Sequence, residues 1–227
     1  QRHGPDSAQA RRAVAAADRQ LTVLCDAAKR RGYEVVVFGD YAIAPAVQAV
    51  LPNVALRDAG LLAVRNVRGM AYADLHASRA FAVADHEIAH VYVPRPDDIA
   101  GVRMVLAELP GVAEVLDAER QQAREVAHPN GGEMLAAAKD GAWFAYPWWT
   151  DPREAPDFAT HVDIHNKPGF DPCELLFGLP PWKTCQDPAR IRGTHGRIGP
   201  GREVGYYSTI EFPRVPGNLI ELAAAVR

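Results

Sequence analysis

Apolar residues recur every three or four positions near the start of the chain. Between residues 14 and 28 they line one face, and this spacing predicts an amphipathic helix over residues 8–31. Ser7, or Asp6 before it, is placed to cap the first turn, because short polar side chains accept hydrogen bonds from the free amide groups there. Gly32 follows two arginines and predicts the end of the helix.

A short apolar run follows the predicted helix. Residues 34–40 contain three consecutive valines and a phenylalanine without the alternation of a strand that has one wet face, so they predict a strand buried on both faces. A helix, a glycine and a buried strand in this order are typical of a parallel α/β sheet. In such sheets ligands bind beyond the carboxyl ends of the strands, which is where Asp40 stands.

The middle of the chain predicts a small separate layer. Two short strands at 80–84 and 89–93 precede a helix at 97–109 and a strand at 111–116. This β-β-α-β order is typical of a compact unit, and we interpret it as an insertion into the main sheet.

The pattern after that layer predicts a hairpin over residues 133–146, with Asp140 and Gly141 at its turn. A segment as long and irregular as 147–200 is uncommon unless it is functional or disordered, and its aromatic residues favour order. The other expected elements are a loop and helix at 45–51, a strand at 205–211 and a helix at 215–226.

The composition is that of an ordinary folded protein. The chain has 227 residues, a net charge of −3 and 48% hydrophobic residues, and no run approaches the ~18 apolar residues that a membrane span needs. The near-neutral charge gives no sign of binding to a nucleic-acid polymer. Three cysteines, odd in number and far apart, favour free thiols in a reducing compartment, so we expect a cytoplasmic location without membrane attachment.

The first residues carry neither a methionine nor a signal peptide, and the first element begins only after Ser7. We therefore expect the chain to be the C-terminal part of a longer gene product, whose N-terminal segment would be its partner. The sequence does not predict an oligomeric state.

Three polar side chains stand in turns where ligands are commonly held. His3 lies in an Arg-His-Gly-Pro loop, Asp40 ends the predicted strand, and His195 lies in Gly-Thr-His-Gly-Arg, whose glycines permit close backbone approach. Carboxylate and imidazole groups are the ligands that Zn²⁺ accepts in catalytic sites with an open position. Taken singly, each residue is better explained structurally, as a histidine in a surface loop or an aspartate that caps the next helix.

Together and in this order, these motifs resemble the C-terminal half of the alkaline phosphatase superfamily, and within it the type I phosphodiesterase/nucleotide pyrophosphatase branch. The family has an Asp-x-x-x-His-x-x-Gly-Pro-like loop, and the stretch from His3 to Pro5 is similar to its end, with the aspartate falling before Gln1. Asp40 matches the family's Asp-His pair after a buried strand. The Gly-Thr-His-Gly around His195 resembles its final Gly-Ser-His-Gly motif.

The resemblance covers nearly the whole chain and implies a fold for it. The expected fold is an alkaline-phosphatase-like α/β sheet flanked by helices, with a small inserted α+β layer. Its parts would be the C-terminal half of the core (1–70), the inserted cap-like layer (71–146) and a long active-site loop that returns to the core (147–227).

The resemblance also implies two divalent ions, Zn²⁺ or Mn²⁺, that clamp the attacking and leaving oxygens of a phosphate ester. His3 and His195 would bind the first ion and Asp40 the second. The family's nucleophile, a Thr or Ser, lies in the N-terminal half, so no catalytic nucleophile is expected in this chain.

The chain departs from the family at Tyr41, which stands where the family has a histidine ligand. A phenol ionises only at about pH 10 and is a poor neutral ligand, unless a nearby cation lowers its pKa. Asp163 and His165 are alternative ligands, or they only brace the long loop. Lys167 beside them, and Arg197 at the end of the Gly-Thr-His-Gly-Arg motif, are candidates for binding phosphate.

Two further groups have a structural and a chemical interpretation. Asp85 and His86 form an Asp-His pair, but strand-like residues flank them, so a hairpin turn is favoured over a metal site. Arg190 and Arg192 either bind phosphate or are solvated surface charges. Four aromatic residues either stack on a base or pack the hairpin and long loop, and packing is favoured: Trp143, Tyr146, Trp148 and Trp149.

The sequence thus predicts part of a metal-dependent hydrolase of small phosphate esters, a phosphodiesterase or nucleotide pyrophosphatase. The alternative is a catalytically degenerate relative that acts as a binding or assembly subunit. Tyr41 and the absent nucleophile motivate this alternative.

Overall fold

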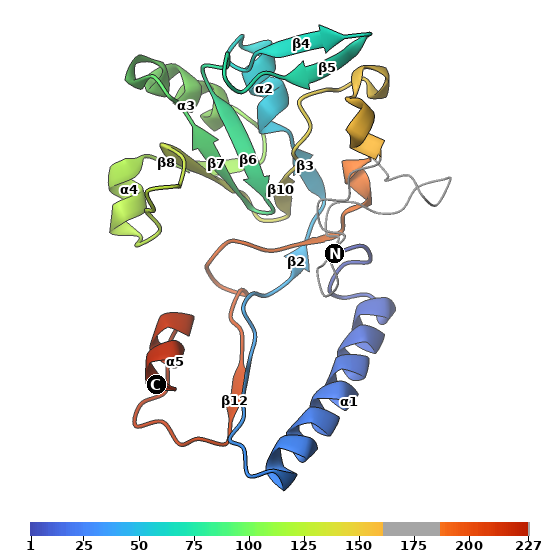
Figure 1. The fold of residues 1–227 in the computed structure, drawn as a ribbon, viewed down its shortest axis with the longest axis vertical. Coiled ribbons are helices and arrows are strands. Elements are labelled where there is room, and N and C mark those ends of the chain that lie inside the picture. The colour runs from blue at the N-terminus through green and yellow to red at the C-terminus, as the bar shows by residue number, and fades with distance from the viewer. Residues whose placement is uncertain (161–186, 227) are drawn as a thin grey trace.

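The computed structural model describes residues 1–160 and 187–226. These residues form a mixed α/β structure with a sheet-containing core and an extended arm (Figure 1), which confirms the predicted fold class. The core comprises residues 44–160 and 187–194, and the arm comprises residues 8–38 and 206–226. No helix of this described part combines the length and apolarity needed to cross a membrane.

The core is built on a four-stranded antiparallel sheet in the order β6-β7-β9-β8. The four elements of the predicted β-β-α-β run are present and supply three of its four strands, while their status as an inserted layer stays a prediction. Alanines and valines at its centre are fully buried, because the two helices α2 and α3 pack on the sheet. The elements are β6 (Phe81–Asp85), β7 (Ile88–Tyr92), α3 (Ile99–Ala107), β8 (Val112–Leu116), β9 (Met134–Ala138) and α2 (Pro52–Asp58).

The predicted hairpin over 133–146 is wrong, although its turn is present. The amide of Ala142 donates to Lys139 O at 3.0 Å, and Gly141 takes a positive φ of 78°. The two strands then diverge: β9 pairs with β7 and β8, whereas β10 (Ala142–Phe144) pairs in parallel with β3 (Gln48–Val50). The aromatic run turns into the core instead, where Trp143 and Phe144 are buried.

The segment predicted as a loop and helix at 45–51 contains two short strands instead. These are β2 (Ala44–Pro45) and β3, and the helix α2 begins only at Pro52, which suits the first turn of a helix because its missing amide hydrogen is not needed there. The other short elements are β4 (Val64–Val67), β5 (Met70–Ala73), α4 (Ala118–Ala123), β11 (Gly193–Thr194) and the 3₁₀ turns η1 (Pro96–Asp98), η2 (Pro152–Glu154), η3 (Asp157–Thr160) and η4 (Pro188–Arg190).

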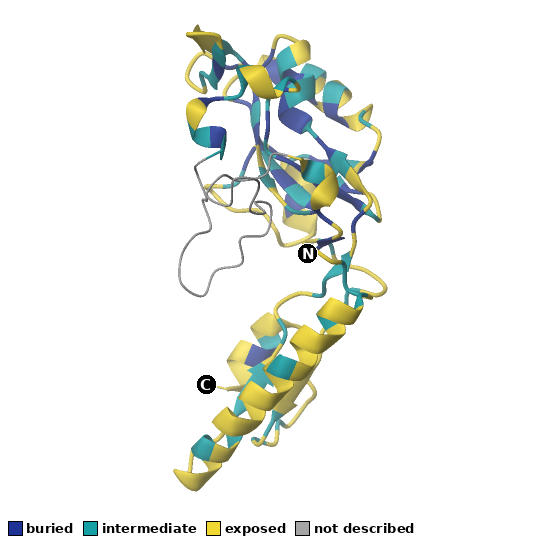
Figure 2. Cartoon of the chain, turned by 90° about the vertical axis from the view of Figure 1, so that its right-hand side faces the viewer, coloured by how far each residue is buried: buried dark blue, intermediate teal, exposed yellow. Residues whose placement is uncertain are grey.

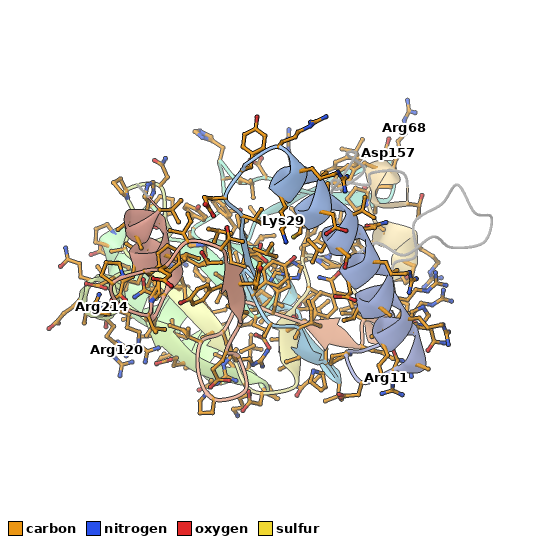
Figure 3. All side chains as sticks on the ribbon, turned by 90° about the horizontal axis from the view of Figure 1, so that it is seen from below. Arg11, Lys29, Arg68, Arg120, Asp157 and Arg214 are labelled. Atoms are coloured by element: carbon orange, nitrogen blue, oxygen red, sulfur yellow. The ribbon has the colours of Figure 1, made fainter. Side chains whose placement is uncertain are left out.

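The arm begins with α1 (Ala8–Arg30), which confirms the first predicted helix. The Ser7 hydroxyl accepts from the Ala10 amide at 3.0 Å, as expected of an N-cap. No residue of α1 is buried; Val14 and Leu24 are 69% and 64% exposed. Figure 2 shows the helix almost wholly exposed, and in Figure 3 Arg11 and Lys29 lie near its two ends.

The predicted strand at 34–40 is present as β1 (Val36–Phe38), but its expected burial on both faces is wrong for the described residues. It pairs only with β12 (Tyr206–Ser208), and the pairing is antiparallel. Phe38 is 53% exposed and Tyr207 is 59% exposed. The C-terminal helix α5 (Leu219–Ala225) completes the arm (Figure 1).

Three segments join the core to the arm. Residues 1–7 start beside the core, where the Arg192 amide donates to Gln1 O at 2.9 Å, and lead into α1. Residues 39–43 lead from β1 to β2, and residues 195–205 lead from β11 to β12 (Figure 1). We call these three segments the crossings; the predicted site residues His3, Asp40 and His195 lie on them, one on each.

Candidate active site

A stack of aromatic rings lies where two of the crossings meet. The rings of Tyr41 and His195 are nearly parallel, with centroids 3.6 Å apart and planes 8° apart. The ring of His86, at the turn between β6 and β7, lies 3.9 Å from that of His195 and is tilted by 41°. The structure therefore brings the Asp40–Tyr41 loop and His195 together and adds His86 to them.

Local pairing explains how these segments meet. β11 pairs with β2, with Thr194 opposite Ala44, so His195 leaves the strand pair close to the loop that contains Tyr41. A side chain at Gly193 would place its Cβ 3.0 Å from Ile43 Cγ2, closer than nearly all real contacts. Glycine at this position therefore permits the close approach of the two segments.

Glu87 holds the segment that follows His195. This glutamate is fully buried, its amide donates to His195 O at 2.9 Å, and its Oε2 accepts from the Arg197 amide at 2.9 Å. Its other oxygen, Oε1, accepts from Arg202 Nη2 at 2.7 Å. Gly196 lies between His195 and Arg197, the two residues bound by Glu87, and has a φ of +123°. A Cβ at this position would lie 3.3 Å from the Glu87 nitrogen. The β6–β7 turn thus fixes the His195 loop through backbone and side-chain bonds.

Arg197, a predicted phosphate ligand, is engaged elsewhere in this structure. Its Nη1 lies 2.6 Å from Asp140 Oδ1, an oxygen that also lies 3.4 Å from Arg202 Nη2. The Asp140–Gly141 turn therefore holds the same loop from the other side. Arg197 as a ligand for phosphate stays a prediction, and any phosphate there competes with Asp140.

Asp40 is exposed, and its Oδ1 accepts from the Tyr41 amide at 3.1 Å. His3 is also exposed and lines a cavity together with residues 187–192. The predicted residues Asp163, His165 and Lys167 lie outside the described residues.

The donor chemistry of the site suits a divalent ion in part. A carboxylate at Asp40 and an imidazole at His195 are ligand types that Zn²⁺ and Mn²⁺ accept. Within residues 1–160 and 187–226, however, no three His, Cys, Asp or Glu side chains gather closely enough to hold a metal ion. The predicted metal ligands of this chain therefore stay predictions.

The sequence interpretation of Asp85 and His86 as a hairpin turn is confirmed, and His86 adopts a positive φ of 56° there. That interpretation missed what the turn does, since His86 contacts the His195 ring and Glu87 binds the His195 loop. No local pattern signals these contacts, because the partners are more than a hundred residues apart. A glutamate between two apolar strands was the one available hint, because buried carboxylates need partners.

The four aromatic residues weighed as a base-stacking group pack within the core. Trp143 and Trp149 are buried, and Trp148 Nε1 donates to Ala71 O at 2.8 Å. Trp148 and Trp149 meet edge to face with centroids 4.9 Å apart. The packing interpretation is therefore confirmed for these residues.

Comparison with known proteins assigns a family. A search of curated sequences finds no match. Among solved structures, the chain is similar to murine ectonucleotide pyrophosphatase/phosphodiesterase 5 (16% identity, 66% of this chain and 37% of that chain, TM-score 0.46). It is also similar to phosphonoacetate hydrolase from Sinorhizobium meliloti (17% identity, 64% and 36% coverage, TM-score 0.45).

The chain thus spans little more than a third of the length of these two structures. The family assignment rests on a separate match, to the family described as type I phosphodiesterase / nucleotide pyrophosphatase, which extends over residues 1–171. This match contains His3, Asp40 and Tyr41 and three quarters of the sequence. The chain therefore belongs to the type I phosphodiesterase/nucleotide pyrophosphatase family.

Proposed function

We propose that this chain is part of a metal-dependent hydrolase of phosphoric esters, of the phosphodiesterase or nucleotide pyrophosphatase type. The observation that carries the proposal is the meeting of the Asp40–Tyr41 loop with His195 in a member of this family. These two segments are 155 residues apart in the sequence, and each carries a motif that the family uses for metal binding.

His3, Asp40 and His195 would hold the two divalent ions, Zn²⁺ or Mn²⁺, together with donors outside the described residues such as Asp163 and His165. The ions would supply positive charge that stabilises the transferring phosphoryl group. The chain's own contribution is orientation, because Glu87 fixes the backbone on both sides of Gly196 and so fixes the direction of the His195 imidazole.

Tyr41 would act as an orienting residue. Its phenol is a poor neutral ligand, but its ring covers one face of the His195 imidazole at 3.6 Å and limits the rotation of that side chain. Lys167 and Arg197 would contact the substrate phosphate, the latter after leaving Asp140.

The proposed unit requires a second segment that carries the Thr or Ser nucleophile, and the arm is where that segment would pack. Along α1 the apolar face from Val14 to Leu24 is exposed, and β1 has one edge without a partner strand among the described residues. An exposed apolar helix face beside an open strand edge is typical of a surface that another part of a sheet protein covers. We propose the N-terminal segment of the same gene product as that cover.

The second candidate function is a binding or assembly subunit without catalysis. It is favoured by the ring stack, in which both Tyr41 and His86 contact the imidazole of His195.

Metal content distinguishes the two functions. Elemental mass spectrometry of the full-length protein, as wild type and His195→Ala, is compared with hydrolysis of bis(p-nitrophenyl) phosphate. His76→Ala is the matched control, because His76 is an exposed histidine on a core loop away from the stack. Close to two ions in wild type, lost together with turnover in His195→Ala but not in the control, supports the hydrolase. Absence of bound metal and of turnover after Zn²⁺ or Mn²⁺ is added contradicts it and supports the subunit.

A further inference from the structure

A polar cavity of about 610 Å³ opens beside the first crossing. It lies between the start of the chain, the start of α1 and the segment around η4. The size is within the usual range for sites that bind small molecules. Its lining residues are Arg2, His3, Ser7, Gln9, Asp187, Ala189, Arg190 and Arg192.

Positive charge dominates this cavity. Three arginines, Arg2, Arg190 and Arg192, face one aspartate, and that aspartate already accepts the Ala189 amide as the N-cap of η4 at 3.0 Å. None of the three guanidinium groups forms an ion pair with a described residue, whereas Arg197 and Arg202 nearby are both paired. Unpaired guanidinium groups converging on one cavity are typical of sites for carboxylate or phosphate.

The N-terminus of α1 adds to the positive electrostatic potential of this cavity. The first amides of a helix have no partner within the helix, and here Ser7, the N-cap, and Gln9 both line the cavity. The first turn of this 23-residue helix contains no acidic residue that would cancel the partial positive charge at its end.

The lining residues also disfavour two classes of ligand, nucleobases and apolar molecules. Among the described residues that line it, the cavity has no Phe, Tyr or Trp on which a nucleobase could stack, and Ala189 is the one apolar residue. The tryptophans weighed earlier for this role are packed in the core. The chemistry therefore favours a small, strongly anionic group over a base or an apolar ligand.

We propose that this cavity binds a phosphate or diphosphate group, and that it holds the anionic part of the substrate or product beside His3. The inference rests on the proposed function for the identity of the bound molecule, since His3 belongs both to the cavity and to the expected metal site. It narrows the substrate to one that presents a phosphate in addition to the ester that is cleaved. A phosphodiester with no other charge would leave the arginines unused.

Binding of inorganic pyrophosphate tests the cavity. Isothermal titration calorimetry is done on the full-length protein in the presence of EDTA, so that phosphate held by a metal ion is not counted. The double variant R190A/R192A loses two guanidinium groups from the lining. The matched control is R30A/R31A, which removes the same charge from exposed positions at the far end of α1.

We expect R190A/R192A to weaken pyrophosphate binding by at least about tenfold, which corresponds to about 1.4 kcal/mol, because the variant removes two charge-assisted contacts. The control should change affinity by less than about twofold, and wild-type affinity should fall as salt is raised. Equal weakening in both variants, or no pyrophosphate binding by wild type in EDTA, overturns the inference.

His195→Ala separates this inference from the proposed function. If the cavity is a phosphate site, His195→Ala binds pyrophosphate in EDTA as wild type does, whether or not it hydrolyses esters. If wild type hydrolyses esters but R190A/R192A binds pyrophosphate normally, the cavity proposal fails and the hydrolase stands. If pyrophosphate binding follows the arginines but no variant shows turnover, the cavity stands and the hydrolase fails.

Discussion

Arg202 and Glu87 form an ion pair that is almost completely withdrawn from solvent, with Nη2 2.7 Å from Oε1 and side-chain exposures of 8% and 0%. The pair joins the β6–β7 turn to the crossing that carries His195. The second terminal nitrogen, Arg202 Nη1, is buried without a hydrogen-bond partner in the described structure. Glu87 is the buried carboxylate that compensates the arginine's charge, beside the longer contact of 3.4 Å from Nη2 to the exposed Asp140 Oδ1.

Replacement of Glu87 should destabilise the core and loosen the His195 loop together. In Glu87→Ala the Arg202 guanidinium and the Arg197 amide lose buried acceptors, and breaking a buried pair in this way costs about 3–5 kcal/mol. Urea denaturation measures the free energy of unfolding. Hydrogen exchange of the amides of residues 195–202 measures how readily the His195 loop opens. Glu211→Ala, on an exposed glutamate, is the control. Equal stability of the two variants would contradict the role assigned to Glu87.

Tyr41→His should strengthen metal binding. A histidine at this position restores the residue type that the family uses, and imidazole binds Zn²⁺ as a neutral group whereas the phenol must first lose a proton. We expect affinity for Zn²⁺ to rise by at least about tenfold, the scale on which single changes around metal sites act. Calorimetric titration with Zn²⁺ measures it, and Tyr41→Phe is the control that keeps the ring. An unchanged affinity in Tyr41→His would show that position 41 does not face the ion.

Gly196→Ala should displace the His195 loop. Its φ of +123° is strained for alanine, and its Cβ would press on the Glu87 nitrogen at 3.3 Å. Gly199→Ala is a matched control, because Gly199 also has a positive φ, +145°, but nothing within 4 Å of the new Cβ. We expect both variants to lose about 1–3 kcal/mol of stability. Only Gly196→Ala should also weaken Zn²⁺ binding; equal binding in both variants would rule out a positioning effect.

The stability of the core should fall in acid through Asp98. Arg79 donates hydrogen bonds to its carboxylate and, with a smaller contribution from Arg95, holds the pKa of Asp98 below its ordinary value. A carboxylate with a lowered pKa in the folded state stabilises the fold above its unfolded pKa, and this contribution is lost as the pH falls towards the folded value.

Asp98→Asn should therefore be less stable than wild type at neutral pH and should approach it in acid. Thermal unfolding from pH 7 to pH 3 measures the difference, with Asp18→Asn on the exposed face of α1 as control. A gap between wild type and Asp98→Asn that does not narrow with acid would contradict this assignment.

Local patterns predicted the elements that rely on local interactions. The helix at 8–30 follows from its cap and spacing, and the β6–β7 hairpin follows from its strand-like residues and the turn between them. The run at 34–40 was predicted as a buried strand because it is rich in valine, but the described residues cover it along one edge only. Burial depends on what packs against a strand, and the pattern of a strand alone does not contain its neighbours.

The candidate site also depends on tertiary contacts that local sequence patterns do not contain. Asp40, Tyr41 and His195 were found from motif and family order, and two of their segments do meet. The contributions of His86 and Glu87 depend on tertiary pairing of segments a hundred residues apart, which no short window contains. The hairpin expected over 133–146 failed for a related reason, since β10 pairs with β3 from an earlier part of the chain.

The three crossings have a mechanical consequence. Residues 39–43 and 195–205 join core and arm covalently, whereas residues 1–7 lead into α1 and contact the core through the Arg192 amide, which donates to Gln1 O; each of the three segments carries one of the predicted ligands (Figure 1). A rotation of the arm relative to the core therefore changes the separations among His3, Asp40 and His195. A ligand that bridges any two of these residues restricts that rotation. Whatever packs on α1 is therefore coupled, through these three segments, to the geometry at these three residues.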